Sequence, residues 1–337
     1  MSWAGVVGQS LAVRLLRQAV ASGQLAHAYL FIGPDGVGKR TVALELAKAL
    51  NCRAPLPDRS ACDACPSCQK LLYSPPSHPD VTVIEPDGRF IKTDQMRELQ
   101  AEMYARPNEG KMRVAIIDGA DRLNAEAGNR VLKLLEEPPA YAVFLLLAQN
   151  LAGILPTIVS RCQTVNFPPL SPEEVRQVLE DRAGLDRAQA RLFAALSGGS
   201  IGRAISIAQN PAAAQRRDDT FDFLRKIGEM DDLSLVSYSE GLEKQRDQLD
   251  EWLEMMLIWL RDALLMDQTG LGNLVINQDR KEDALQLAHR YGSGHLAAMV
   301  DAVSEARSRI QRNANVRLCL DVLLLELSGA ARLAEGS

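Results

Sequence analysis

Short apolar runs alternate with amphipathic segments in the first half of the chain. Apolar runs of strand length occur at residues 28–33, 114–117 and 141–150, and a further short strand, QTVNF, is predicted at 163–167. Between them, residues 42–50 and 124–137 carry apolar side chains at helical spacing, and the second segment is ended by two prolines. Strands that alternate with helices predict an α/β domain with a mainly parallel sheet.

The second half of the chain has helical periodicity only. A Phe-Pro-Pro sequence at 167–169 marks a boundary, and Ser171, Pro172 and Glu174 form the start signal of a helix. We predict residues 266–282 to be a loop. One helical face further along is apolar at three- and four-residue steps: Leu249, Trp252, Leu253, Met256, Leu260 and Leu264. The pattern predicts three domains: an α/β domain over 1–168, a small helical domain over 169–211 and an all-α domain over 212–337.

Composition narrows the class of protein. The chain has 337 residues, 47% hydrophobic and 24% charged, which is typical of a folded globular protein. Its net charge of −5 argues against a protein that coats DNA through bulk positive charge. We find no apolar run long enough to cross a membrane and no secretory signal, so we expect no membrane partner and a cytoplasmic location.

A glycine-rich loop follows the first predicted strand. Residues 33–41 read GPDGVGKRT and lead directly into the helix over 42–50. Strand, glycine loop and helix are the context of a P-loop, in which backbone N–H groups surround phosphate oxygens. Gly33, Gly36 and Gly38 would shape the loop, and Lys39 would reach the terminal phosphates of ATP bound with Mg²⁺.

Two positions depart from a hydrolytic P-loop protein. Arg40 stands where the magnesium-binding hydroxyl is expected, and Thr41 lies one residue later, about 100° around the helix. Asp118 ends the strand over 114–117, where a carboxylate orients magnesium, but the next residue is Gly119 and no second acid follows it directly. Because glycine cannot act as a general base, we expect nucleotide binding without efficient hydrolysis.

Four of the six cysteines lie within seventeen residues. Cys52, Cys62, Cys65 and Cys68 have the spacing C-x9-C-x2-C-x2-C. Four thiolates complete the tetrahedron that structural zinc prefers, and such a closed shell leaves no position for a catalytic water. The alternatives are a chance cluster or a redox pair, which a reducing compartment disfavours. We therefore predict a zinc module at 52–68.

An arginine lies just before the last predicted strand, at Arg161 in the sequence Ser-Arg-Cys. Such a residue can reach a neighbouring subunit's phosphate and stabilise its transition state, although spacing alone favours an ordinary surface arginine. Gln149 and Asn150 close the preceding strand, where a polar side chain could sense a γ-phosphate.

The motifs together resemble a known family. GQLAHAYLFIGPDGVGK (23–39), the four cysteines, HPDVTVIEP (78–86), IKTDQMREL (91–99), KLLEEPP (133–139) and SRC (160–162) occur in the order seen in bacterial DNA polymerase III clamp-loader AAA+ subunits. The closing segment NANVRLCLDVLLLELSG (313–329) is similar to the last helix of that family. The resemblance implies an AAA+ P-loop domain with an inserted zinc module, then a helical lid, then an all-α collar through which subunits oligomerise.

Within that family the chain resembles the delta-prime branch. Arg40, Gly119 and Gly202, which lies where motor subunits carry an arginine, all point to a degraded nucleotide site. The resemblance implies gamma/tau and delta as partners in a pentamer, with the sliding clamp and primed DNA as substrates. It also implies that Arg161 acts as a trans arginine finger while the chain's own ATPase is weak or absent.

Two other functions remain open from the sequence. A gamma/tau-like motor would use Thr41 and Asp121 in place of the missing groups. A stand-alone zinc-dependent DNA-binding P-loop protein would bind DNA without partners, which the acidic second half of the chain argues against.

Overall fold

The computed structural model describes residues 3, 5–73, 75–88, 90–210, 212–272, 274–312 and 314–335. The chain forms two compact units, one of residues 1–174 with 199–203 and the other of residues 175–198 with 204–337. The predicted division into three domains stays a prediction, since these units divide the helical lid differently. Among the described helices, none is long and apolar enough to cross a membrane.

The N-terminal unit is built on a five-stranded parallel sheet, as the alternation of strands and helices predicted. The strand order is β2-β3-β4-β1-β5. The strands are β1 (Ala28–Ile32), β2 (Val81–Ile84), β3 (Arg113–Asp118), β4 (Ala142–Ala148) and β5 (Gln163–Asn166). The helices are α1 (Ser10–Ser22), α2 (Lys39–Asn51), α3 (Pro66–Lys70), α4 (Thr93–Tyr104), α5 (Ala125–Glu136) and α6 (Pro156–Val159), with a 3-10 turn η1 (Ala120–Arg122).

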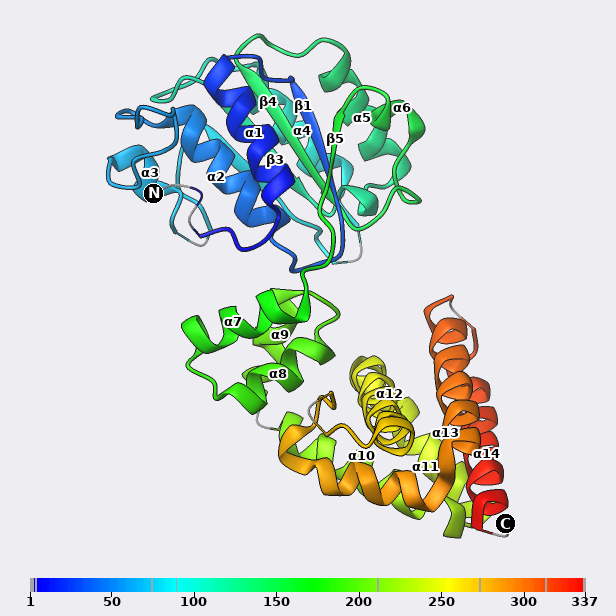
Figure 1. The fold of residues 1–337 in the computed structure, drawn as a ribbon. Coiled ribbons are helices and arrows are strands. Elements are labelled where there is room, and N and C mark those ends of the chain that lie inside the picture. The colour runs from blue at the N-terminus through cyan, green and yellow to red at the C-terminus, as the bar shows by residue number, and fades with distance from the viewer. Residues whose placement is uncertain are drawn as a thin grey trace. The chain divides into compact units, whose positions relative to one another are not determined.

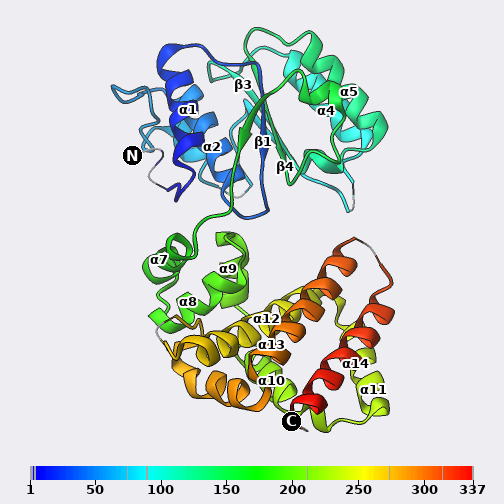
Figure 2. The same ribbon diagram turned by 45° about the vertical axis from the view of Figure 1, so that its right-hand side comes forward.

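Helices cover both faces of this sheet. Helices α1 and α2 lie on one face, and α4 and α5 lie on the other (Figures 1 and 2). All seven residues of β4 are buried because this strand is central and covered on both sides. Alternate residues of the strands therefore pack into different layers, and Phe144 and Leu146 join Met96 and Leu134 in the layer formed with α4 and α5.

The remaining helices are α7 (Pro172–Ala183), α8 (Arg187–Leu196), α9 (Ile201–Ala208), α10 (Ala212–Lys226), α11 (Asp232–Lys244), α12 (Arg246–Thr269), α13 (Lys281–Gln311) and α14 (Val316–Glu335), with 3-10 turns η2 (Ile227–Glu229) and η3 (Gln278–Arg280). Helix α13 packs against both α12 and α14, and α11 packs against α14. The predicted apolar face of α12 is confirmed for five of its six residues, which are buried: Leu249, Trp252, Leu253, Met256 and Leu260.

Two local predictions in the helical region have different outcomes. The helix start at Ser171 is confirmed, because its backbone N–H and hydroxyl donate to the Glu174 carboxylate while Glu174 N–H donates back to the hydroxyl. The predicted loop over 266–282 is too long. Helix α12 continues to Thr269, where Gly270 in a left-handed conformation ends it, and α13 begins at Lys281.

A buried aspartate fixes the segment that leads into β3. Asp80 is fully buried and accepts backbone N–H donors from Asn108 at 2.6 Å, Glu109 at 2.9 Å and Gly110 at 2.6 Å. Burial acts to raise the pKa of Asp80, but these three donors outweigh it and hold the pKa below its usual range.

We expect Asp80→Ala to lower the free energy of unfolding by about 3 kcal/mol at neutral pH, since three N–H groups lose a charged acceptor. Because the folded pKa is depressed, this stabilisation is complete above the ordinary aspartate pKa of about 4 and is lost as the pH falls through the folded value. Urea unfolding of wild type and variant from pH 7 to pH 3 checks both points. Asp87→Ala, at an exposed aspartate, is the matched control. If the difference in unfolding free energy between wild type and Asp80→Ala stays constant across the pH range, the depressed pKa of Asp80 is contradicted.

Candidate functional site

The predicted P-loop is formed between β1 and α2. Gly33 N–H donates to Ala148 on β4, and Gly38 is the N-cap of α2. Lys39 begins the helix, and its Nζ donates to the carbonyls of Gly33 at 2.5 Å and Pro34 at 2.8 Å. The lysine is buried, which lowers its pKa, while Asp35 and Asp118 act in the opposite direction. The ammonium group of Lys39 is thus held against the loop whose bound phosphates it would contact.

Residues 199–203 pack directly on this loop. Gly202 N–H donates to Gly36 O at 3.1 Å. Gly36 has a left-handed conformation (φ 71°), and a Cβ placed there would lie 2.3 Å from Ser200 Oγ. Glycine is therefore required at position 36 both by the backbone and by the contact. Gln149, at the end of β4, donates to Asp35 on the other side of the loop.

Arg40 connects the start of α2 to the ends of two strands. Its Nη1 forms an ion pair with Glu85, just after β2, and lies 3.4 Å from Oδ2 of Asp118, the last residue of β3. Burial raises the pKa of Asp118, and the nearby Arg40 and Lys39 reduce that shift. Thr41 is exposed. A guanidinium therefore occupies the place of the hydroxyl ligand and pairs with the carboxylate, an arrangement that does not fit a magnesium ion.

The position after Asp118 does not suit an acidic side chain. Gly119 has φ 85°, and a Cβ placed there would lie 3.1 Å from Cγ of Pro86. A glutamate at 119 would be strained in this left-handed conformation. Asp121 lies in the 3-10 turn that follows, and its Oδ1 is buried without a hydrogen-bond partner among the described residues.

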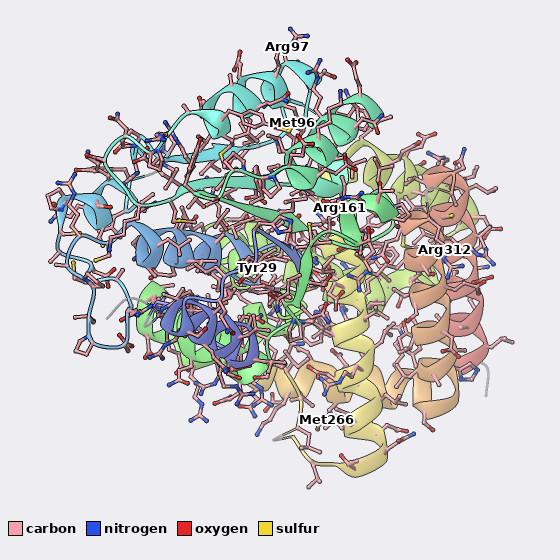
Figure 3. All side chains as sticks on the ribbon, turned by 90° about the horizontal axis from the view of Figure 1, so that it is seen from above. Tyr29, Met96, Arg97, Arg161, Met266 and Arg312 are labelled. Atoms are coloured by element: carbon pink, nitrogen blue, oxygen red, sulfur yellow. The ribbon has the colours of Figure 1, made fainter. Side chains whose placement is uncertain are left out.

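Arg161 lies between α6 and β5, as the sequence predicted, and Figure 3 labels it beside α6. Its side chain is 36% exposed and donates to Thr157 O at 3.1 Å and to Glu136 Oε1 at 2.9 Å. Glu136 is half exposed. An exposed pair of this kind contributes about 0–1 kcal/mol, so the guanidinium can be released to a partner at little cost.

The four predicted metal ligands come together. The sulfur atoms of Cys52, Cys62, Cys65 and Cys68 all lie within 4.8 Å of one another. Cys52 Sγ is 3.5 Å from Cys62 Sγ and 3.9 Å from Cys65 Sγ. A tetrahedral ion with metal–sulfur bonds of about 2.3 Å needs sulfur separations of about 3.8 Å. The cluster therefore fits one four-coordinate metal ion.

Backbone donors prepare one thiol of this cluster for metal binding. Burial acts to raise the pKa of Cys65, but backbone N–H donors, those of Cys68 and Arg53 first, outweigh it and lower the pKa to about 6. Burial raises the pKa of Cys68 well above its usual range. The cluster thus contains one thiol that ionises readily at neutral pH and one that needs a bound cation to do so.

A buried chain of hydrogen bonds connects the cysteine cluster to the sheet, and no sequence pattern predicted it. Ser67, next to Cys68, donates to Asn51 O at 2.8 Å and lies 3.0 Å from His78 Nε2. His78 is buried, which lowers its pKa and favours the neutral ring. The Asn51 side chain in turn accepts the N–H groups of residues 111 and 112. The end of α2, the cluster and the entry to β3 are thus connected.

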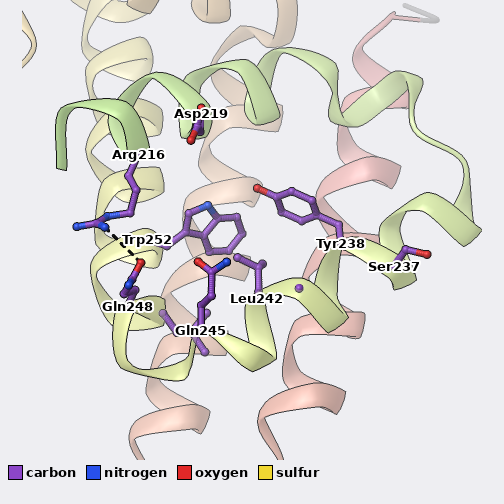
Figure 4. A pocket seen from close by; sticks show the side chains of 10 residues that line it. Arg216, Asp219, Ser237, Tyr238, Leu242, Gln245, Gln248 and Trp252 are labelled. Carbon is purple, nitrogen blue, oxygen red and sulfur yellow. Dashed lines mark hydrogen bonds between the residues drawn. The ribbon is translucent and has the colours of Figure 1, made fainter. Parts of the chain in front are cut away.

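A cavity lies in the C-terminal unit, among α10, α11 and α12 (Figure 4). It has a volume of about 320 Å³. Trp252 and Tyr238 form one wall, with ring centroids 6.1 Å apart, and Arg216 at the rim donates to Gln248. Burial raises the pKa of Tyr238 to about 12, so its phenol stays protonated at neutral pH. The cavity therefore lacks an ionised phenol that could act as a base.

Most of the chain matches one group of proteins, the subunits of DNA polymerase III. Residues 8–171 match the family described as DNA polymerase III, delta subunit, and residues 211–329 match DNA polymerase III, delta subunit, C terminal. DNA polymerase III subunit delta' of Bacillus subtilis (strain 168) is 30% identical over 322 residues, which are 95% of this chain and 96% of that protein. The chain belongs to the delta' family of DNA polymerase III subunits.

Other relatives differ in how much of their length is matched. The delta' subunit of Pseudomonas aeruginosa is 30% identical over 90% of this chain and 92% of that protein. DNA polymerase III subunit tau of Escherichia coli (strain K12) is 29% identical over 80% of this chain but only 43% of that protein. A solved gamma subunit-related protein of Thermotoga maritima aligns over 95% of this chain and 99% of its own at 20% identity, with a TM-score of 0.48.

The cysteine geometry predicts one tightly bound metal ion per chain. Cys65→Ser should lose most of that metal and lower the Tm by several degrees, because metal binding contributes directly to the folding free energy. Elemental analysis and thermal unfolding of natively purified protein measure both effects. Cys319→Ser, at an isolated buried cysteine, is the control and should keep the metal. Wild-type protein purified without any metal would rule the site out.

Proposed function

We propose that this chain is a delta'-type subunit of a DNA polymerase III clamp loader and helps to place the sliding clamp on primed DNA. Its partners are then gamma/tau and delta subunits in a pentamer. The proposal rests on membership of the delta' family and, above all, on one observation: the P-loop is built while Arg40 pairs with Asp118 where a metal would lie. Such a subunit keeps the fold of an ATPase but hydrolyses little or no ATP itself.

In this proposal Arg161 acts on the neighbouring ATPase. Its guanidinium would stabilise the charge that develops on the transferred phosphate, as arginine fingers do in trans. Breaking the ion pair between Arg161 and Glu136 requires little free energy because both side chains are substantially exposed. The Thr157 carbonyl, which also accepts from the guanidinium, gives the side chain a defined starting position beside α6.

A motor of the gamma/tau type is less well supported. It would require Thr41 to bind magnesium and Asp121 to activate water. Thr41 is exposed and one position around the helix from the usual ligand, while Arg40 already pairs with Asp118. Asp121 lies in η1 beyond Gly119, so the acid is displaced from the end of β3.

Zinc is the metal that we assign to the cysteine cluster. Four thiolates at these separations suit zinc's tetrahedral preference, and a closed Cys₄ shell has no open position for catalysis. Its role is then structural: it holds the module that Ser67 ties to the end of α2.

We expect Arg161→Ala, assembled into the reconstituted loader, to reduce ATP turnover at the adjoining site by at least about 100-fold, since a transition-state cation is lost. Arg161→Lys should restore only part of it, because an ammonium lacks the guanidinium fork. Steady-state ATPase and clamp-loading assays provide the measurement.

Glu136→Ala is the matched control for this substitution. It removes the resting ion pair without touching the guanidinium, and we expect turnover to stay within about two-fold of wild type. If Arg161→Ala assembles normally and leaves turnover and clamp loading unchanged, Arg161 has no role in trans.

A further inference from the structure

The residue at position 40 determines whether a metal ion or a side-chain cation lies beside the P-loop. A hydroxyl here would offer an oxygen ligand to a metal ion, whereas a guanidinium has five N–H donors and no acceptor. The Arg40 side chain also pairs with Asp118 and Glu85, which end two neighbouring parallel strands. These two carboxylates are therefore bonded to a cation that belongs to the chain itself.

The guanidinium keeps donors available for a ligand. Both ion-pair contacts are made through Nη1, and among the described residues no partner is found for Nη2 or Nε. Arginine binds phosphate through two parallel N–H donors, which makes it a good substitute for a cation in front of phosphate oxygens. The side chain is 38% exposed, so a ligand can reach it.

Charges of both signs surround Lys39 and Arg40, and the carboxylate of Asp121 is one of them. Lys39 directly precedes Arg40 at the start of α2. The positive end of the helix dipole lies at this helix start. Asp35 and Glu85 are more than half exposed, so water screens their negative charge. Asp118 is the more buried carboxylate and is paired with Arg40.

We propose that Arg40 takes the place of Mg²⁺ in this P-loop, so that the site binds nucleoside di- or triphosphates without a divalent cation. The metal-free nucleotide then acts as a fixed part of the subunit rather than as a substrate. The inference deepens the proposed function, since it concerns the nucleotide site of the same subunit.

Calorimetric titration of the full chain with ATP and with ADP, in EDTA and in millimolar MgCl₂, tests this directly. The wild type should bind in EDTA with a Kd no more than three-fold weaker than in MgCl₂. Arg40→Thr, which restores the hydroxyl, should bind at least ten-fold more tightly with MgCl₂ than with EDTA. Arg40→Lys, which keeps a cation but not the fork, should bind more weakly than wild type yet stay independent of magnesium.

Arg97→Thr is the matched control, since Arg97 is exposed on α4 and paired with Asp94; its titrations should equal those of wild type. A wild-type Kd at least ten-fold tighter with MgCl₂, or no binding in either buffer by a folded wild type, would overturn the proposal. Circular dichroism of each variant confirms folding. Because the titration uses the chain alone, its failure leaves the role of Arg161 in the loader to be decided separately.

Discussion

The guanidinium of Arg40 lies beside two carboxylates that the sheet brings to one edge. Glu85 directly follows β2, Asp118 ends the parallel neighbour β3, and Arg40 lies in the first turn of α2, so a single side chain can contact both carboxylates. The loop, Lys39 and the packing of Gly36 on residues 199–203 all retain P-loop architecture around this pair. The P-loop architecture is thus kept, while a guanidinium lies where we propose that a metal ion would otherwise bind.

A second set of long-range contacts lies at the other end of α2. Asn51 ends that helix and accepts two backbone N–H groups from the segment before β3, while its carbonyl accepts the hydroxyl of Ser67 next to the cysteine cluster. Asp80 fixes the preceding residues of the same segment. One helix therefore connects the P-loop at its start to the metal module at its end, which suits a subunit that holds its shape while its neighbours hydrolyse ATP.

Local spacing in the sequence was sufficient for four of the five strands, the P-loop and the cysteine cluster, because each depends on residues that are close together in the chain; β2 was not predicted. Glu85 and His78 could not be recognised in the same way. Glu85 matters only because β2 lies beside β3, and His78 only because the chain returns to Ser67. The contact of Gly202 with Gly36 likewise joins residues far apart in sequence. The loop over 266–282 was overestimated because polar residues there belong to helix ends.

We propose that this chain supplies architecture and an arginine to the loader rather than ATP turnover. Steady-state ATP hydrolysis by the reconstituted loader, containing either wild type or Lys39→Ala, tests it most directly, with gel filtration to show that both loaders assemble. Equal turnover is the predicted result, because removing the P-loop lysine from a site that does not hydrolyse ATP changes nothing in the total. A loss close to the full share of one ATPase site would contradict the account and favour a motor subunit.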